Sequence, residues 1–317
     1  MRIKSLLFAI VVGLVGTIGS AWAGVDADAS KKCMKCHEDD AETFNKTPHA
    51  VAADSRTPTC VSCHGPSENH VKKPSANAPD RLFTAKTTLT AAERSDVCLT
   101  CHDKDSRRAL WAGSQHPSAD VACNSCHKVH AQRDRALVKL TQPEVCYSCH
   151  KEQRMQVQRP SHHPIPEGKM ACADCHNVHG SSGPKLVKRD SVNDTCYLCH
   201  AEKRGPFVHP HQPVTDDCAS CHNPHGTAIA SMLKARPPML CQQCHTPHVA
   251  GGVGAVGGQN GVFNSPGGGI APQVGGVSSG KNVVNLWQGR SCMNCHTQVH
   301  GSNNPSVTNP TPQYLYR

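Results

Sequence analysis

The chain of 317 residues has very few aromatic side chains and little else from which to build an ordinary hydrophobic core. Phe, Trp and Tyr together number twelve, whereas Gly and Pro together number 48. Burial of large apolar side chains is the main favourable term in folding, so this chain buries little apolar surface of its own. Another group must supply the core.

After its first two dozen residues, the sequence also lacks an apolar run long enough to cross a bilayer. The start itself is typical of an export signal. Arg2 and Lys4 precede an uncharged, mostly apolar run at 6–19, and Ala21-Trp22-Ala23 fits a cleavage site. We therefore expect a signal peptide at 1–23 and an exported, periplasmic protein that starts at Gly24. A retained membrane anchor is the alternative.

No cysteine is left over for a disulfide or a free thiol, because all twenty lie in ten CxxC pairs that are each followed directly by histidine. We number these CxxCH motifs 1 to 10 in chain order. Their cysteines are Cys33, Cys36, Cys60, Cys63, Cys98, Cys101, Cys123, Cys126, Cys146, Cys149, Cys172, Cys175, Cys196, Cys199, Cys218, Cys221, Cys241, Cys244, Cys292 and Cys295. Their histidines are His37, His64, His102, His127, His150, His176, His200, His222, His245 and His296.

CxxCH is the attachment sequence of c-type haem, and its spacing has a physical reason. Residues i, i+3 and i+4 of a helical turn share a face, so two thiols can bond the two vinyl groups of one porphyrin while the imidazole reaches the iron. Zinc ribbons also use CxxC pairs, but they do not need a histidine after every pair. The sequence therefore predicts ten covalently bound c-type haems, with these ten histidines as proximal ligands.

Twelve further histidines lie outside the motifs, and their positions repeat. In the repeated unit, one histidine lies seven to eleven residues before a motif and another lies three to six residues after it. Matching cysteines of successive units are 45 to 50 residues apart. The adjacent pairs His162/His163 and His209/His211 each count as one ligand, and we choose His163 and His211 because they keep the register. Ten distal ligands are thus predicted for ten irons: His49, His70, His116, His130, His163, His179, His211, His225, His248 and His300.

The second histidine of CASCHNPHG (218–226), His225, follows His222 too closely to reach the opposite face of the same haem, so we expect it to bind a neighbouring haem. Methionine is the competing axial ligand. Met34 and Met293 lie between paired cysteines, and the other methionines keep no repeat register, so we interpret them as packing residues.

The formal charge of +9 would ordinarily suggest an anionic partner. Two propionates on each of ten haems would more than reverse it, so we interpret the basic side chains as counter-charges and expect no nucleic acid partner. With two histidines on every iron, no coordination position is open for a substrate. We therefore expect an electron carrier and no enzyme, while charge storage and weak reduction at an exposed haem edge stay open.

Several stretches resemble a known family: SVNDTCYLCHAEKRGP (191–206), CASCHNPHG (218–226), LCQQCH (240–245) and RSCMNCHTQVHGSN (290–303). They are similar to the periplasmic decahaem cytochromes of the MtrA/DmsE type, and the resemblance covers nearly the whole mature chain. It implies a bis-histidine haem chain that sits in an outer-membrane β-barrel porin and conducts electrons across the outer membrane, for metal reduction or iron oxidation. The implied partners are that porin, a periplasmic or inner-membrane quinol-linked cytochrome, and an extracellular multihaem cytochrome or terminal reductase. The alternative is a soluble periplasmic shuttle, or a donor to a terminal reductase such as a DMSO or nitrite reductase.

The expected fold is a multihaem cytochrome c, in which short helices and long loops wrap around an elongated haem chain with little or no sheet. The resemblance implies two pentahaem halves, at 24–151 and 152–317. The second half contains a Gly-rich insert, 249–290, whose residues 249–280 carry no charged side chain. The insert is either a linker or a loop that packs inside a barrel or against an outer partner. His248 follows His245 more closely than the family pattern implies.

Two motifs are preceded by sequences that predict the start of a helix. Thr90-Ala-Ala-Glu93 lies before Cys98 and Thr141-Gln-Pro-Glu144 lies before Cys146, and both have the spacing of a capping box.

Overall fold

The computed structural model describes residues 27–51, 56–245, 292–294 and 296–303. The predicted signal peptide, nearly all of the Gly-rich insert and His248 lie outside these ranges. The chain divides into two compact units, Met1–Val97 with Lys128–Asp134, and Cys98–His127 with Arg135–Arg317. The expected division into halves at 151 and 152 stays a prediction.

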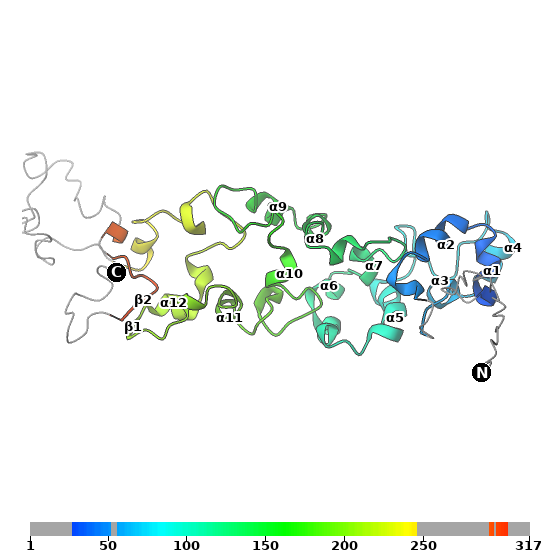
Figure 1. Cartoon of the computed structure of the whole chain (residues 1–317), viewed down its shortest axis with the longest axis horizontal. Coiled ribbons are helices and arrows are strands. Elements are labelled where there is room, and N and C mark those ends of the chain that lie inside the picture. Colours follow the sequence, from blue (N-terminus) through cyan, green and yellow to red (C-terminus); the bar gives the residue numbers. More distant parts are fainter. Residues whose placement is uncertain (1–26, 52–55, 246–291, 295, 304–317) are drawn as a thin grey trace, which may run out of the picture. The chain divides into compact units, whose positions relative to one another are not determined.

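Short helices joined by loops make up the described part of the chain, as expected (Figure 1). The α-helices are α1 (Ala27–Met34), α2 (Glu38–Phe44), α3 (Cys60–His64), α4 (Glu68–Lys72), α5 (Ala91–His102), α6 (Gln115–Ser118), α7 (Cys123–Cys126), α8 (Gln142–Cys146), α9 (Lys151–Gln156), α10 (Cys172–Cys175), α11 (Val192–Cys196) and α12 (Gln212–Asp216). The 3-10 helices are η1 (Pro48–Ala50), η2 (Ser106–Arg108), η3 (Trp111–Gly113), η4 (Arg135–Leu137), η5 (Pro184–Leu186), η6 (Ala201–Lys203), η7 (Cys218–Ser220), η8 (Ala230–Met232), η9 (Cys241–Gln243) and η10 (Cys292–Asn294). Among the described helices, none combines the length and apolar character needed to cross a membrane.

Sheet structure is minimal, as predicted. Within the described ranges it consists of β1 (His209–Pro210) and β2 (Gly301–Ser302), which pair antiparallel with His209 opposite Ser302. This pairing brings the segment after motif 7 to the segment after motif 10, about ninety residues apart in sequence.

The apolar core is small, which agrees with the scarcity of aromatic residues. The buried apolar side chains among the described residues are Phe44, Ala91, Ala122, Tyr147, Val157, Ala171 and Val187. Ala122 and Ala171 directly precede the first cysteines of motifs 4 and 6, and Tyr147 follows the first cysteine of motif 5. Three of these seven buried side chains thus belong to CxxCH motifs or directly precede them.

One of the two predicted capping boxes is confirmed. The Thr90 amide donates to Glu93 Oε2 (2.7 Å) and the Glu93 amide donates to Thr90 Oγ1 (3.2 Å), just before α5. The box at Thr141 is wrong. Thr141 has helical backbone angles, its hydroxyl donates to the carbonyl of Arg135 (2.9 Å), and Glu144 forms an ion pair with Arg154 (3.6 Å).

The internal repeat predicted from the sequence is visible in matching local structures. Tyr147 in motif 5 and Tyr197 in motif 7 each lie under an arginine seven residues later, Arg154 at 6.0 Å and Arg204 at 5.8 Å from the ring centroid. Burial raises the pKa of Tyr147 to about 12.

Candidate functional site

The predicted proximal and distal histidines meet in pairs. For eight motifs, the ring of the proximal histidine lies opposite the ring of a distal candidate, with 6.0 to 6.3 Å between the ring centroids. The pairs, proximal residue first, are His37–His70, His64–His130, His127–His179, His150–His116, His176–His225, His200–His163, His222–His300 and His245–His211.

This separation is the one that two imidazoles need to bind one metal ion from opposite sides. A metal–imidazole bond of about 2.0 Å and a ring radius of about 1.1 Å place two trans ring centroids about 6.2 Å apart. The interplanar angle varies from 14° for His222–His300 to 86° for His116–His150, yet the distance stays constant. Direct ring packing would change the distance with the angle, whereas a shared metal would not. These residues therefore fit an iron held by two histidines.

Hydrogen bonds orient several of these rings and fix their tautomer. Among the distal candidates, His70 Nδ1 lies 2.8 Å from the carbonyl oxygen of Asn77 and His116 Nδ1 lies 2.9 Å from that of Val178. A carbonyl can only accept, so Nδ1 carries the proton and Nε2 keeps its lone pair for a metal. Such partners of ligand histidines set ring orientation and raise ligand basicity.

The proximal histidines of motifs 6 and 8 receive the same support from two equivalent left-handed turns. His176 Nδ1 donates to the carbonyl of Lys185 (3.0 Å), and His222 Nδ1 donates to that of Ser231 (2.7 Å). Lys185 and Ser231 have φ values of 52° and 58°, a region that costs a non-glycine residue roughly 1 kcal/mol or more. Strain repeated at matching positions indicates that these carbonyls must face the rings.

Burial keeps several of the paired rings neutral. Desolvation is the largest influence that lowers the pKa of His64, His176, His179, His225 and His300 below the ordinary value for histidine. Neutral imidazole is the form that binds a metal. The site therefore favours ligation over protonation.

Polar side chains inside motifs 2, 4 and 6 cap the start of the short helices that carry the cysteines. The residue before the second cysteine accepts a hydrogen bond from the amide that precedes the first cysteine: Ser62 from Thr59 (3.0 Å), Ser125 from Ala122 (3.1 Å) and Asp174 from Ala171 (2.9 Å). These bonds satisfy a free amide at the helix start and hold one turn that presents both thiols.

In four pairs of consecutive motifs, the first cysteines lie against each other. Side-chain hydrogen bonds join Cys33 to Cys60, Cys146 to Cys172, Cys196 to Cys218 and Cys241 to Cys292. Motifs 1 and 2, 5 and 6, 7 and 8, and 9 and 10 are therefore adjacent pairs. Groups attached through these thiols would lie close to one another.

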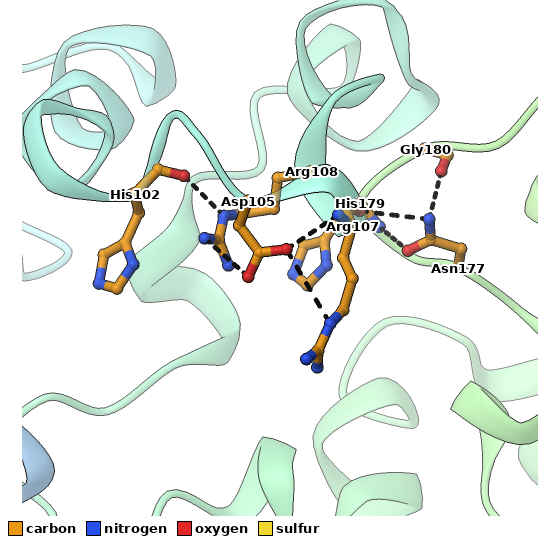
Figure 2. A network of polar contacts seen from close by, with 7 residues as sticks. All are labelled: His102, Asp105, Arg107, Arg108, Asn177, His179 and Gly180. Carbon is orange, nitrogen blue, oxygen red and sulfur yellow. Dashed lines mark hydrogen bonds and ion pairs between the residues drawn. The ribbon is translucent and has the colours of Figure 1, made fainter.

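A polar network ties the loop after motif 3 to the segment after motif 6, as Figure 2 shows. The Arg108 guanidinium donates to the carbonyl of His102 (3.0 Å) and pairs with Asp105 (3.1 Å). Asn177 donates to the carbonyls of Arg107 (3.2 Å) and Gly180 (2.6 Å). The backbone N–H of Arg107 is the chief cause that lowers the pKa of Asp105 below its ordinary value.

The structure separates the histidines between which the sequence left a choice. His163 and His211 face proximal histidines, whereas His162 contacts Glu167 (3.1 Å) and the carbonyl of Arg159. His209 lies in β1. Of the other distal candidates, His49 lies in η1 and His248 is outside the described residues.

Sequence reasoning missed the groups that orient the ligands, because most are backbone carbonyls and carry no residue signature. One signal was present: CHNVHG (175–180) and CHNPHG (221–226) share an asparagine two residues before the distal histidine. The spacing of cysteine and histidine explains nothing about that asparagine.

The comparisons with known proteins agree with this geometry. The doubled CXXCH motif family matches residues 162–205 and 211–250, the cytochrome c-type protein NrfB-like family matches 60–139, and the N-terminal region of the NapC/NirT cytochrome c family matches 1–77.

Three relatives are similar over shorter or longer parts of the chain. The chain is 42% identical over 282 residues to the multiheme cytochrome MtrA of Shewanella baltica, an alignment that covers 86% of this chain and 78% of the relative. It is 32% identical over 154 residues to the cytochrome c-type protein NrfB of Haemophilus influenzae, which covers 40% of this chain and 67% of the relative. It is 30% identical over 128 residues to the NrfB of Escherichia coli, which covers 38% and 65%. Together with the CxxCH motifs, the likeness to MtrA shows that this chain belongs to the MtrA family of multihaem c-type cytochromes, electron-transfer proteins with covalently bound haem.

Proposed function

We propose that this chain holds ten haems, each ligated by two histidines, and conducts electrons across the outer membrane inside a porin. The observation that carries the proposal is the set of ring pairs with a constant separation of 6.0 to 6.3 Å. Haem supplies a one-electron centre at each pair, and the two histidines close both axial positions. His49 and His248 stay predicted as the two further distal ligands. They would serve the two motifs whose proximal histidines are His102 and His296.

The contacts between motifs favour conduction along the chain. In the larger unit, Cys126 lies close enough to Cys146 to raise the pKa of its thiol, and the same holds for Cys175 beside Cys196 and Cys244 beside Cys221. With the first-cysteine contacts described above, these interactions join motifs 4 to 10 in chain order. Electron tunnelling weakens steeply with distance, so an unbroken succession of neighbouring centres is what a wire requires.

Closed axial positions also favour an electron carrier over an enzyme. A substrate that binds iron needs a free coordination site, whereas electron transfer needs only that the ligands stay in place during the change of redox state. Rings oriented by backbone carbonyls, as at His163 and His211, and a ring whose pKa is lowered by burial, as at His225, meet that requirement.

The porin and the outer cytochrome are proposed as partners because the chain resembles the MtrA/DmsE type and is similar to MtrA over most of its length. The second candidate is a soluble periplasmic shuttle or a donor to a terminal reductase. It is favoured by the NrfB-like family match at 60–139 and by the two NrfB relatives.

Co-purification followed by reconstitution distinguishes these two functions. The chain is recovered from detergent-solubilised outer membrane, reconstituted with its co-purifying porin in sealed liposomes that contain a redox dye, and exposed to an external reductant. A conduit reduces the internal dye only when both chain and porin are present. Recovery solely from the soluble periplasm, without reduction of the internal dye, would contradict the conduit and favour the shuttle.

A further inference from the structure

We propose that Asn177 and Asn223 are positioning residues, each of which orients the distal ligands of two successive haems through one turn. This inference rests on the proposed ligation of each iron by two histidines. It concerns the residues that hold the ligands, which neither the CxxCH motifs nor the ring pairs assign.

Each turn concerns two distal histidines, and the first of them is part of the turn itself. In the turn 177–180, the Gly180 amide donates to the Asn177 carbonyl (3.0 Å) and the His179 amide donates to Asn177 Oδ1 (3.4 Å). The turn 223–226 is built in the same way, with Gly226 donating to the Asn223 carbonyl (3.1 Å) and His225 donating to Asn223 Oδ1 (3.2 Å). An asparagine side chain that accepts from the amide two residues later is the usual way to stabilise such a turn.

The second ligand is oriented by the carbonyl between the asparagine and the histidine. His116 Nδ1 donates to the Val178 carbonyl (2.9 Å), and His163 Nδ1 donates to the Pro224 carbonyl (2.7 Å). His116 faces the proximal histidine of motif 5 and His179 faces that of motif 4. One turn therefore sets ligands for motifs 4 and 5. By the same contacts, the turn at Asn223 sets ligands for motifs 6 and 7.

Both turns are held firmly against other backbone. Asn177 Nδ2 donates to the carbonyls of Arg107 and Gly180, which anchors the turn to η2 (Figure 2). Gly180 and Gly226 have φ values of 118° and 138°, and a Cβ atom at either would clash with the backbone oxygen of Leu110 or Gln156. Little room remains for the turn to shift, so a change in the asparagine is transmitted to the two rings.

The chain contains a matched comparison at motif 10. The turn 298–301 has the same backbone bond, from Gly301 to the Gln298 carbonyl (3.1 Å), and the Val299 carbonyl accepts from His211 Nδ1 (2.9 Å). Gln298 stands in place of the asparagine, and its side chain makes no hydrogen bond to this turn among the described residues. Substitution of Gln298 therefore tests whether a change at this turn position alters ligand orientation when no asparagine bond is lost.

The experiment measures ligand-plane geometry in the full-length, haem-loaded protein. Electron paramagnetic resonance of low-spin ferric haem distinguishes near-parallel from crossed imidazole planes. The pairs His127–His179 and His116–His150 have interplanar angles of 16° and 86°, so Asn177→Ala should alter one near-parallel and one crossed-plane signal. Asn223→Ala should alter the near-parallel signal of His176–His225 (19°) and the intermediate signal of His163–His200 (50°).

Three further variants make the test specific. Asn223→Asp keeps the acceptor oxygen and should retain the wild-type signals, whereas Asn223→Gln displaces it and should behave like Asn223→Ala. Gln298→Ala should change nothing. Hydrogen exchange at the His225 amide should rise about five-fold in Asn223→Ala, the factor expected for the loss of one typical hydrogen bond. Haem stoichiometry by mass shows whether each variant is fully loaded.

The proposal is overturned if Asn177→Ala or Asn223→Ala alters a single haem or none, or if Gln298→Ala has the same effect. If Asn223→Ala loses haem, the electron paramagnetic resonance signals of Asn223→Gln and Asn223→Asp are compared instead. Equal signals from these two variants overturn the proposal. A high-spin iron in the wild-type protein would instead contradict ligation by two histidines, so failure of the two ideas can be told apart.

Discussion

Substitution of His225 by alanine tests the assignment of a distal ligand to a neighbouring motif. His225 lies 6.2 Å from His176 of motif 6 at an interplanar angle of 19°, whereas His222, three residues before it, faces His300. The substitution should therefore open one axial position in motif 6 and none in motif 8. Cys172 and Cys175 still hold the haem covalently, so its loss is not expected.

The number of haems that His225→Ala should affect follows from the pairing of His225 with His176. One of the ten predicted haems should become high-spin in the ferric state and bind about one equivalent of carbon monoxide when reduced, and the lost low-spin signal should belong to the near-parallel class. Carbon monoxide titration, optical spectroscopy and electron paramagnetic resonance measure these three quantities.

His162→Ala is the matched control for this variant. His162 contacts Glu167 and the Arg159 carbonyl, so its removal should leave every haem six-coordinate. If His225→Ala bound no carbon monoxide, or if the signal that disappeared came from a crossed-plane haem, the pairing of His225 with His176 would be refuted.

Further predictions concern ligand geometry, capping and a constrained turn. His116→Ala should also create one high-spin haem, but the signal lost should be of the crossed-plane class, because His116 and His150 are 86° apart; electron paramagnetic resonance decides, and loss of a near-parallel signal would refute it. Thr90→Ala should lower the free energy of unfolding by about 1 kcal/mol through loss of the capping box at α5, measured by denaturant unfolding against Glu93→Gln as the conservative variant. The Thr90 bonds lower the pKa of Glu93, so the effect of Thr90→Ala should be full above the ordinary glutamate pKa and should diminish as the pH falls through the lowered value; an effect that grew on acidification would contradict this. Gly226→Ala should destabilise by about 1–3 kcal/mol because of its φ of 138° and the clash with the Gln156 carbonyl oxygen, whereas Gly113→Ala, which meets nothing within 4 Å, should not; equal unfolding midpoints would show that the turn is unconstrained.

The sequence predicted the parts of the fold that follow from covalent chemistry and composition. Short helices begin or end at the CxxCH motifs, and twelve aromatic residues among 317 cannot build a large core, so short helices and minimal sheet were expected and are confirmed. The capping box at Thr90 was predicted correctly because its partners are four residues of one helix start. The box at Thr141 failed because Arg135 and Arg154, outside that local window, provide alternative partners for Thr141 and Glu144.

Which residues face one another could not be predicted in the same way. His116 donates to the Val178 carbonyl, 62 residues away, and His211 donates to the Val299 carbonyl, 88 residues away. A carbonyl acceptor has no side-chain signature, and the choice between neighbouring turns depends on tertiary packing. The repeat register nevertheless favoured His163 over His162, because histidines that serve equivalent positions recur at equivalent spacing.

The most direct test of the account combines the intact mass of the exported protein with the spin state of its oxidised irons. We predict the mass of the polypeptide plus ten haems and only low-spin, six-coordinate ferric iron. Fewer than ten haems, or a high-spin iron in the resting protein, would contradict the claim that two histidines close every centre.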